Sequence, residues 1–134
     1  MNNFDLCKTS LTFLFIGLLN LYYGYKIFFL LYTITSLFSF IHWYFNRKYN
    51  YIKKIDSFFA KYTALVIFYN IFLLNNFSIK FLFSIIGLLL SYFYFNSQKK
   101  RKDYDLSYYN SHFCFHIIAI IIMILLLISK NKNL

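Results

Sequence analysis

The amino-acid sequence predicts an all-α membrane protein, a bundle of about five transmembrane helices in a single domain over residues 1–134. Hydrophobic residues make up 60% of the chain and charged residues 13%, whereas a soluble domain has about half and about a quarter. The apolar residues form long runs without Pro, and a spanning helix needs about 20 of them. These observations exclude a soluble enzyme, a disordered chain and any sizeable domain outside the membrane.

The apolar runs place the five spans at about residues 10–25, 27–45, 57–74, 77–95 and 112–129. The first run resembles a signal-peptide core, but the bulky LNLYYGYK after it offers no small-residue cleavage site, so we expect this helix to be retained. Trp43 and Tyr44 lie near the end of the second run and Tyr94 near the end of the fourth, and these are residue types typical of membrane interfaces. The third begins directly after Asp56, a residue that could cap the helix, and the fifth begins at His112.

Basic residues are unequally divided between the two sides of such a bundle. Loops between five spans alternate in side, which puts ten Lys and Arg residues on one side and four on the other. The positive-inside rule assigns the richer side to the cytoplasm, so we expect a cytoplasmic N-terminus and a C-terminus across the membrane. Because orientation accounts for these clusters, the net charge of +10 does not indicate a nucleic-acid partner. The ten are Lys8, Arg47, Lys48, Lys53, Lys54, Lys61, Lys99, Lys100, Arg101 and Lys102, and the four are Lys26, Lys80, Lys130 and Lys132.

The three histidines are predicted to lie in one layer near the cytoplasmic face. His42 is near the end of the second span, His112 and His116 open the fifth, and Asp56 opens the third. Ionisable residues at such positions are costly and usually mark function. The four-residue spacing puts His112 and His116 on one helix face, about one turn apart.

Two imidazoles at that spacing can bind one metal ion, and His42 from a facing helix would complete a set of three nitrogen ligands. Catalytic zinc usually has three protein ligands and one open position, which makes zinc the predicted metal. Iron, nickel and copper also accept imidazole ligands. The alternative is that the histidines are interfacial side chains without a metal.

The sequence around these residues resembles a known family. The stretch SFIHWYFNRKYNYIKKIDSFFAKYTALVIF carries a His, a basic loop and an Asp that opens the next span, and NSHFCFHIIA carries HxxxH. These elements are similar to the signature of the CREST superfamily of membrane hydrolases, which includes alkaline ceramidases, progestin and adipoQ receptors and hemolysin III-like proteins. The resemblance implies zinc held by His42, His112 and His116, with Asp56 near the metal-bound water.

The sequence departs from the family pattern in two respects. The family has seven spans and this chain is predicted to have five, so the resemblance is to a shortened form. The family Ser lies four residues before the first His, where this sequence has Phe38. Ser39, three residues before His42, is the candidate for that role, on a neighbouring part of the helix face.

Together these observations predict a zinc-dependent integral-membrane hydrolase of a lipid amide, similar to a ceramidase. Zinc would lower the pKa of bound water toward about 7 and polarise the carbonyl. Asp56 would hold the water or exchange its proton, and Ser39 would hydrogen-bond the water or the oxyanion. The substrate, such as ceramide, would enter from the bilayer. Two alternatives stay open: a non-catalytic zinc- and lipid-binding membrane receptor or sensor, and a small membrane scaffold without a metal site.

Overall fold

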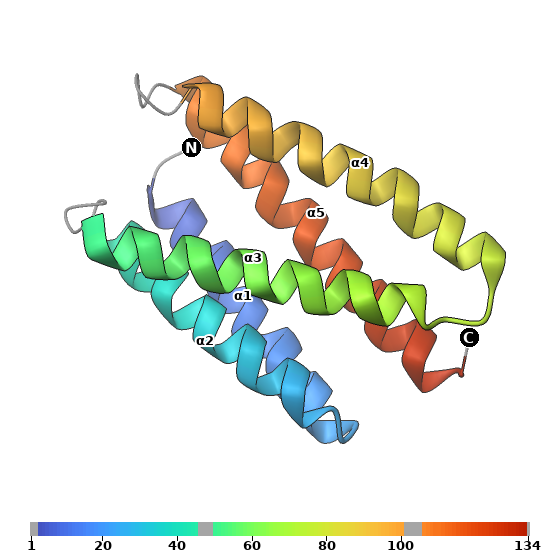
Figure 1. The fold of residues 1–134 in the computed structure, drawn as a ribbon. Helices are drawn as coiled ribbons and strands as arrows, with labels where there is room; N and C mark the ends of the chain where they lie inside the picture. The colour runs from blue at the N-terminus through green and yellow to red at the C-terminus, as the bar shows by residue number, and fades with distance from the viewer. Residues whose placement is uncertain (1–2, 46–49, 101–105, 134) are drawn as a thin grey trace. The chain divides into compact units, whose positions relative to one another are not determined.

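A computed structural model describes residues 3–45, 50–100 and 106–133, and in this part of the chain it contains helices and no strand (Figure 1). Four of its helices are long and apolar enough to cross a membrane by length and composition, namely α1, α2, α4 and α5. The predicted all-α, multi-pass membrane class is therefore confirmed. The helices are α1 (Asn3–Tyr22), α2 (Lys26–Tyr44), α3 (Asn50–Phe72), α4 (Phe77–Lys100) and α5 (Leu106–Asn131).

The third helix differs from the other four in composition. Its first half, NYIKKIDSFFAK, carries three lysines and one aspartate, whereas its second half, YTALVIFYNIF, is apolar. This is why α3 is not among the helices that reach the apolar content of a membrane span. By length and composition, four of the five predicted spans therefore qualify, and α3 does not.

The helices extend beyond the apolar runs that predicted them. α1 begins at Asn3 instead of near residue 10, α3 at Asn50 instead of 57, and α5 at Leu106 instead of 112. An apolar run marks only the part of a helix suited to hydrocarbon, while backbone hydrogen bonding continues into the polar residues beside it. Asp56 therefore lies inside α3, and the interpretation of Asp56 as a helix cap is wrong. His112 likewise lies within α5, six residues after its start, and does not open it.

The chain divides into two compact units, an N-terminal unit (Asn3–Asn70) and a C-terminal unit (Ile71–Leu134). In the N-terminal unit α1 and α2 pack as an antiparallel hairpin (Figure 1). The turn between them contains Gly24 at a φ of 84°, in the left-handed region that glycine favours. The helices approach closely at Gly17, where an added Cβ would lie 3.3 Å from the Tyr32 Cβ and 3.4 Å from the Phe29 carbonyl oxygen.

Hydroxyl groups join α1 to α2 nearer the open end of this hairpin. The Ser10 and Ser39 hydroxyls share a hydrogen bond of 2.9 Å, and the Ser36 hydroxyl donates to the Ser10 carbonyl oxygen at 2.7 Å. All three serines are buried. Small side chains and interhelical hydrogen bonds are the usual means of helix association in a membrane, where lipid removes the hydrophobic drive between helices.

The third helix packs along α2 within the same unit. The Thr35 and Thr63 hydroxyls hydrogen-bond at 3.0 Å, and the rings of Phe38 and Phe59 stack with centroids 5.7 Å apart. From the first of these contacts to the second, the α2 residue number rises by three and the α3 number falls by four, so the two helices are antiparallel. In this register α3 runs alongside α2, and its place as the third span stays a prediction.

In the C-terminal unit α4 and α5 form a second antiparallel hairpin (Figure 1). The Asn96 amide donates to the Ser111 hydroxyl at 3.2 Å, and the Tyr94 and Phe115 rings lie with centroids 5.6 Å apart. These two contacts align the end of α4 with the first half of α5, the part that carries both histidines.

Candidate metal centre

His112 and His116 lie one above the other on α5. Their ring centroids are 4.9 Å apart with an interplanar angle of 54°. His116 is 3% exposed and His112 is half-buried. The helix therefore brings both imidazoles to one face, as the four-residue spacing predicts, and at this separation the two rings can turn toward one ion.

Aromatic side chains frame the histidine pair. Tyr108, which is buried, stacks on His112 with centroids 5.8 Å apart, and Phe115 lies 5.6 Å from the His112 ring and 6.0 Å from that of His116. Tyr108, His112 and His116 form a column at four-residue intervals. Tyr108 was not among the predicted site residues, although the pattern YxxxHxxxH would have indicated it.

Two imidazoles are fewer than the three protein ligands that a catalytic zinc ion usually takes, so the predicted site needs a third. Across residues 3–45, 50–100 and 106–133, no group of three or more His, Cys, Asp or Glu side chains is arranged to hold a metal ion. His42, the predicted third ligand, belongs to the N-terminal unit and the pair to the C-terminal unit. The joint binding of one ion by all three histidines stays a prediction.

His42 lies in the last turn of α2 and is buried. Its ring packs edge-on against that of Trp43, with centroids 4.9 Å apart, and Trp43 is among the most buried side chains of the chain. A buried imidazole at the end of a membrane helix fits the predicted layer near one face. The alternative, a histidine near the interface without a metal, stays open.

Asp56 lies on the side of α3 that faces α2. It precedes Thr63, which bonds to α2, by seven residues, or two helical turns. The register set by Phe38 with Phe59 carries Asp56 to the height of His42 on α2. The two residues that the sequence placed in one layer therefore share a level within the N-terminal unit.

The environment of Asp56 suits a proton-transfer group. Desolvation by burial raises the pKa of its carboxyl from the ordinary 3.8 to about 7. A carboxyl that titrates near neutral pH can both accept and return a proton under physiological conditions. The acid–base role of Asp56 stays a prediction, with which the raised pKa is consistent.

Ser39, the second candidate catalytic residue, is 3% exposed and its hydroxyl bonds to that of Ser10 on α1. Its observed contact is therefore within the α1–α2 interface, and its part in catalysis stays a prediction.

A second carboxylate was overlooked in the sequence. Asp5 lies in the first turn of α1, two residues before Cys7, whose thiol contacts the Phe40 carbonyl oxygen of α2 at 4.0 Å.

This contact puts Asp5, like Asp56, near the level of His42. It was overlooked because the apolar run that predicted α1 begins only near residue 10. The Asn-rich start NNFD, with an acidic residue in the first helical turn, is the signal that would have extended the helix to include it.

Comparison with known proteins finds no relative of the chain: no family model, no curated protein and no solved structure matches it.

Proposed function

We propose that the chain is a zinc-dependent integral-membrane hydrolase of a lipid amide, with His112, His116 and His42 as metal ligands. The observation that carries this proposal is the histidine pair on α5, two imidazoles with centroids 4.9 Å apart in a helix suited to span a membrane. Ionisable groups at membrane depth are costly, so two of them on one face of such a helix favour a functional site.

Asp56 is the proton-transfer group of the proposed reaction. A bound zinc ion would supply Lewis acidity and lower the pKa of its water. The Asp56 carboxyl, with its pKa near 7, takes a proton as water adds to the amide carbonyl and returns it to the departing amine. Tyr108 and Phe115 hold the imidazole planes through ring contacts and keep bulk water from the pair.

The membrane helices favour a lipid as substrate. The histidines lie in helices whose other residues are mostly Phe, Leu, Ile and Tyr, so an acyl chain can remain in apolar surroundings while the amide reaches the imidazoles. We also propose that the N-terminus and the metal site face the cytoplasm, because ten of the fourteen basic residues fall on that side in a five-span topology.

One observation favours a second candidate, a non-catalytic zinc- and lipid-binding receptor or sensor. Ser39 is held in the α1–α2 interface by Ser10 and Ser36 lies beside it, so these hydroxyls already have a structural role. A chain that keeps the histidine pair but uses its serine for packing would retain metal binding without turnover.

Hydrolysis of a lipid panel separates the two candidates. The purified chain, loaded with zinc in detergent, is incubated with ceramide, an N-acyl ethanolamine and an ester lipid, and released fatty acid is measured by mass spectrometry. We expect release from an amide lipid, at least 100-fold lower in His112→Ala/His116→Ala, because general acid–base and metal effects each contribute about two orders of magnitude or more.

The matched control is Asn110→Ala, which changes an exposed residue of α5 outside the histidine column. It should keep full activity. Folded, zinc-loaded protein that releases no fatty acid from any lipid would favour the receptor. Equal release by the histidine variant would contradict both the site and the reaction.

A further inference from the structure

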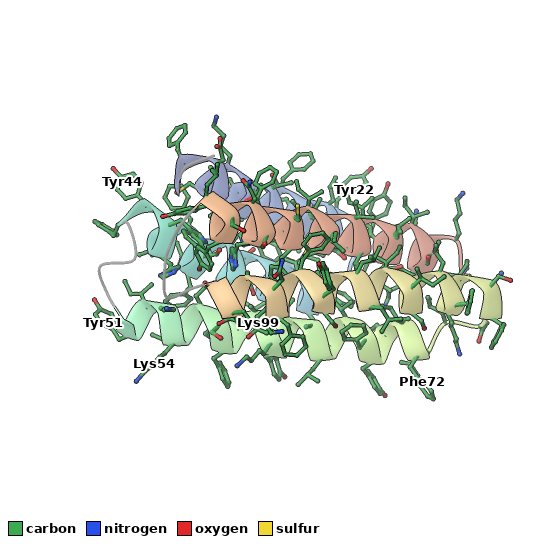
Figure 2. The ribbon with its side chains drawn as sticks, turned by 90° about the horizontal axis from the view of Figure 1, so that it is seen from above. Tyr22, Tyr44, Tyr51, Lys54, Phe72 and Lys99 are labelled. Carbon is green, nitrogen blue, oxygen red and sulfur yellow. The ribbon has the colours of Figure 1, made fainter. Side chains whose placement is uncertain are left out.

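One face of α3 is open and carries lysines between aromatic residues. Phe58 is 64% exposed, Tyr62 49% and Leu65 68%, and Lys54 and Lys61 are exposed beside them. Steps of three and four residues keep these side chains on one side of the helix, which we call the outer face of α3. Figure 2 shows Lys54 and Phe72 projecting from the same side of this helix.

The outer face has only positive charge. α3 contains one acidic residue, Asp56, which lies on the opposite side with Thr63 and Phe59, the residues that contact α2. Lys54 and Lys61 are seven residues apart, so they are about 10 Å apart along the helix axis and on the same line. Beside them the Phe58 and Tyr62 rings stack with centroids 6.5 Å apart and planes nearly parallel, at 7°.

Lys61 lies deep along the helix, where an unpaired positive charge is unfavourable and an anionic ligand would neutralise it. The contacts of Phe59 with Phe38 and of Thr63 with Thr35 put Lys61 opposite residues 36 and 37 of α2. That level is about seven residues, or roughly 11 Å, inside the end of α2 at Tyr44. An exposed ammonium at such a depth is costly in hydrocarbon unless it reaches toward the headgroups and finds an anion there.

We propose that the outer face of α3 binds one anionic phospholipid from the surrounding leaflet. Its phosphate lies between the Lys54 and Lys61 ammonium groups, and the Tyr62 hydroxyl donates to a phosphate or glycerol oxygen. The acyl chains follow the apolar continuation of the same face, along Leu65 and Phe72. Aromatic rings beside the lysines fit the interfacial region in which Tyr is enriched.

Charge selects the lipid class. A zwitterionic headgroup offers its phosphate together with a cation that two lysines repel, whereas phosphatidylserine or phosphatidylglycerol keeps a net negative charge. Anionic lipids are abundant in the cytoplasmic leaflet, the side to which the positive-inside rule assigns the start of α3. This lipid binds outside the histidine layer and does not depend on the proposed hydrolysis.

Native mass spectrometry of the full chain in detergent tests the proposal. Phosphatidylserine and phosphatidylcholine with identical acyl chains are titrated separately, and the first bound lipid is quantified. A lysine near an anionic lipid contributes roughly fivefold in affinity. We therefore expect the serine lipid to bind at least tenfold more tightly, and Lys54→Gln/Lys61→Gln to remove that preference.

Two controls isolate the outer face. Lys26→Gln/Lys132→Gln removes the same charge from exposed positions elsewhere and should keep the preference, and Lys54→Arg/Lys61→Arg should keep it because both cations remain. Equal binding of the two lipids by the native chain would overturn the proposal. So would an unchanged preference in Lys54→Gln/Lys61→Gln, or an equal loss in the Lys26/Lys132 control, which would reduce the effect to net charge.

Discussion

At the residue scale, the polar side chains of this chain fall into two groups with different consequences. Ser10, Ser36 and Ser39 satisfy one another across a helix interface, so packing accounts for their burial. His112, His116 and Asp56 are ionisable, and removing such groups from water costs free energy that a hydroxyl does not incur. Ionisable groups in poorly solvated surroundings are typical of functional sites, which is why the proposed chemistry rests on these residues together with His42.

Asp56→Asn is expected to stabilise the metal-free protein at about pH 8. The folded-state pKa of about 7 lies above the ordinary 3.8, so the folded chain holds this proton more tightly than the unfolded chain does. Folding stability therefore falls as the pH rises from about 4 to 7, and the amide variant escapes that loss. Thermal unfolding followed by circular dichroism, in detergent with a chelator, should show a gain in Tm that shrinks as the pH is lowered.

Ser57→Ala is the control, because it changes the neighbouring residue without altering a titratable group. Its Tm relative to the native chain should not depend on pH. A loss of stability in Asp56→Asn that grows as the pH rises would mean that the folded protein stabilises the ionised carboxylate, which would contradict the raised pKa of Asp56.

At the scale of elements, close approach of α1 and α2 at Gly17 fixes the hairpin that positions His42. A Cβ added at Gly17 would lie 3.3 Å from the Tyr32 Cβ and 3.4 Å from the Phe29 carbonyl oxygen, which is closer than most van der Waals contacts. The Ser10–Ser39 hydrogen bond continues the same interface toward the His42 end. The register of the hairpin, and thus the height of His42, depends on these small residues.

Gly17→Leu is expected to lower the stability of the protein by about 1–3 kcal/mol or more, because the added side chain must force α2 away from α1. The expected measurement is a Tm several degrees below that of the native chain. Ser84→Leu places the same side chain at an exposed site of α4 and should leave Tm nearly unchanged. A Tm unaffected by Gly17→Leu would contradict the observed close contact.

At the scale of the whole molecule, composition and apolar runs were sufficient to predict the all-α membrane class, because the bilayer demands long apolar helices. They were insufficient for the helix ends. Helical hydrogen bonding continues past the hydrocarbon, which is why Asp5 and Tyr108 were missed. Apolar periodicity also says nothing of the register between helices, which depends on single contacts such as Thr35 with Thr63.

The candidate site likewise has features that the sequence predicted and features that depend on helix packing. The four-residue spacing predicted the shared face of His112 and His116, because helix geometry alone decides it. Asp56 and His42 share a level because α3 packs on α2. The sequence predicted only that both residues lie near the same membrane face. The participation of His42 with the pair at one ion stays a prediction from the sequence.

Metal content tests the central claim most directly. Elemental mass spectrometry of the detergent-purified, zinc-supplied chain should find about one zinc per chain, which three protein ligands and an open position would hold. The metal should be lost in His112→Ala/His116→Ala, reduced in His42→Ala and retained in Asn110→Ala. Folded native protein without bound metal, or a histidine variant that keeps its zinc, would contradict the proposed metal centre.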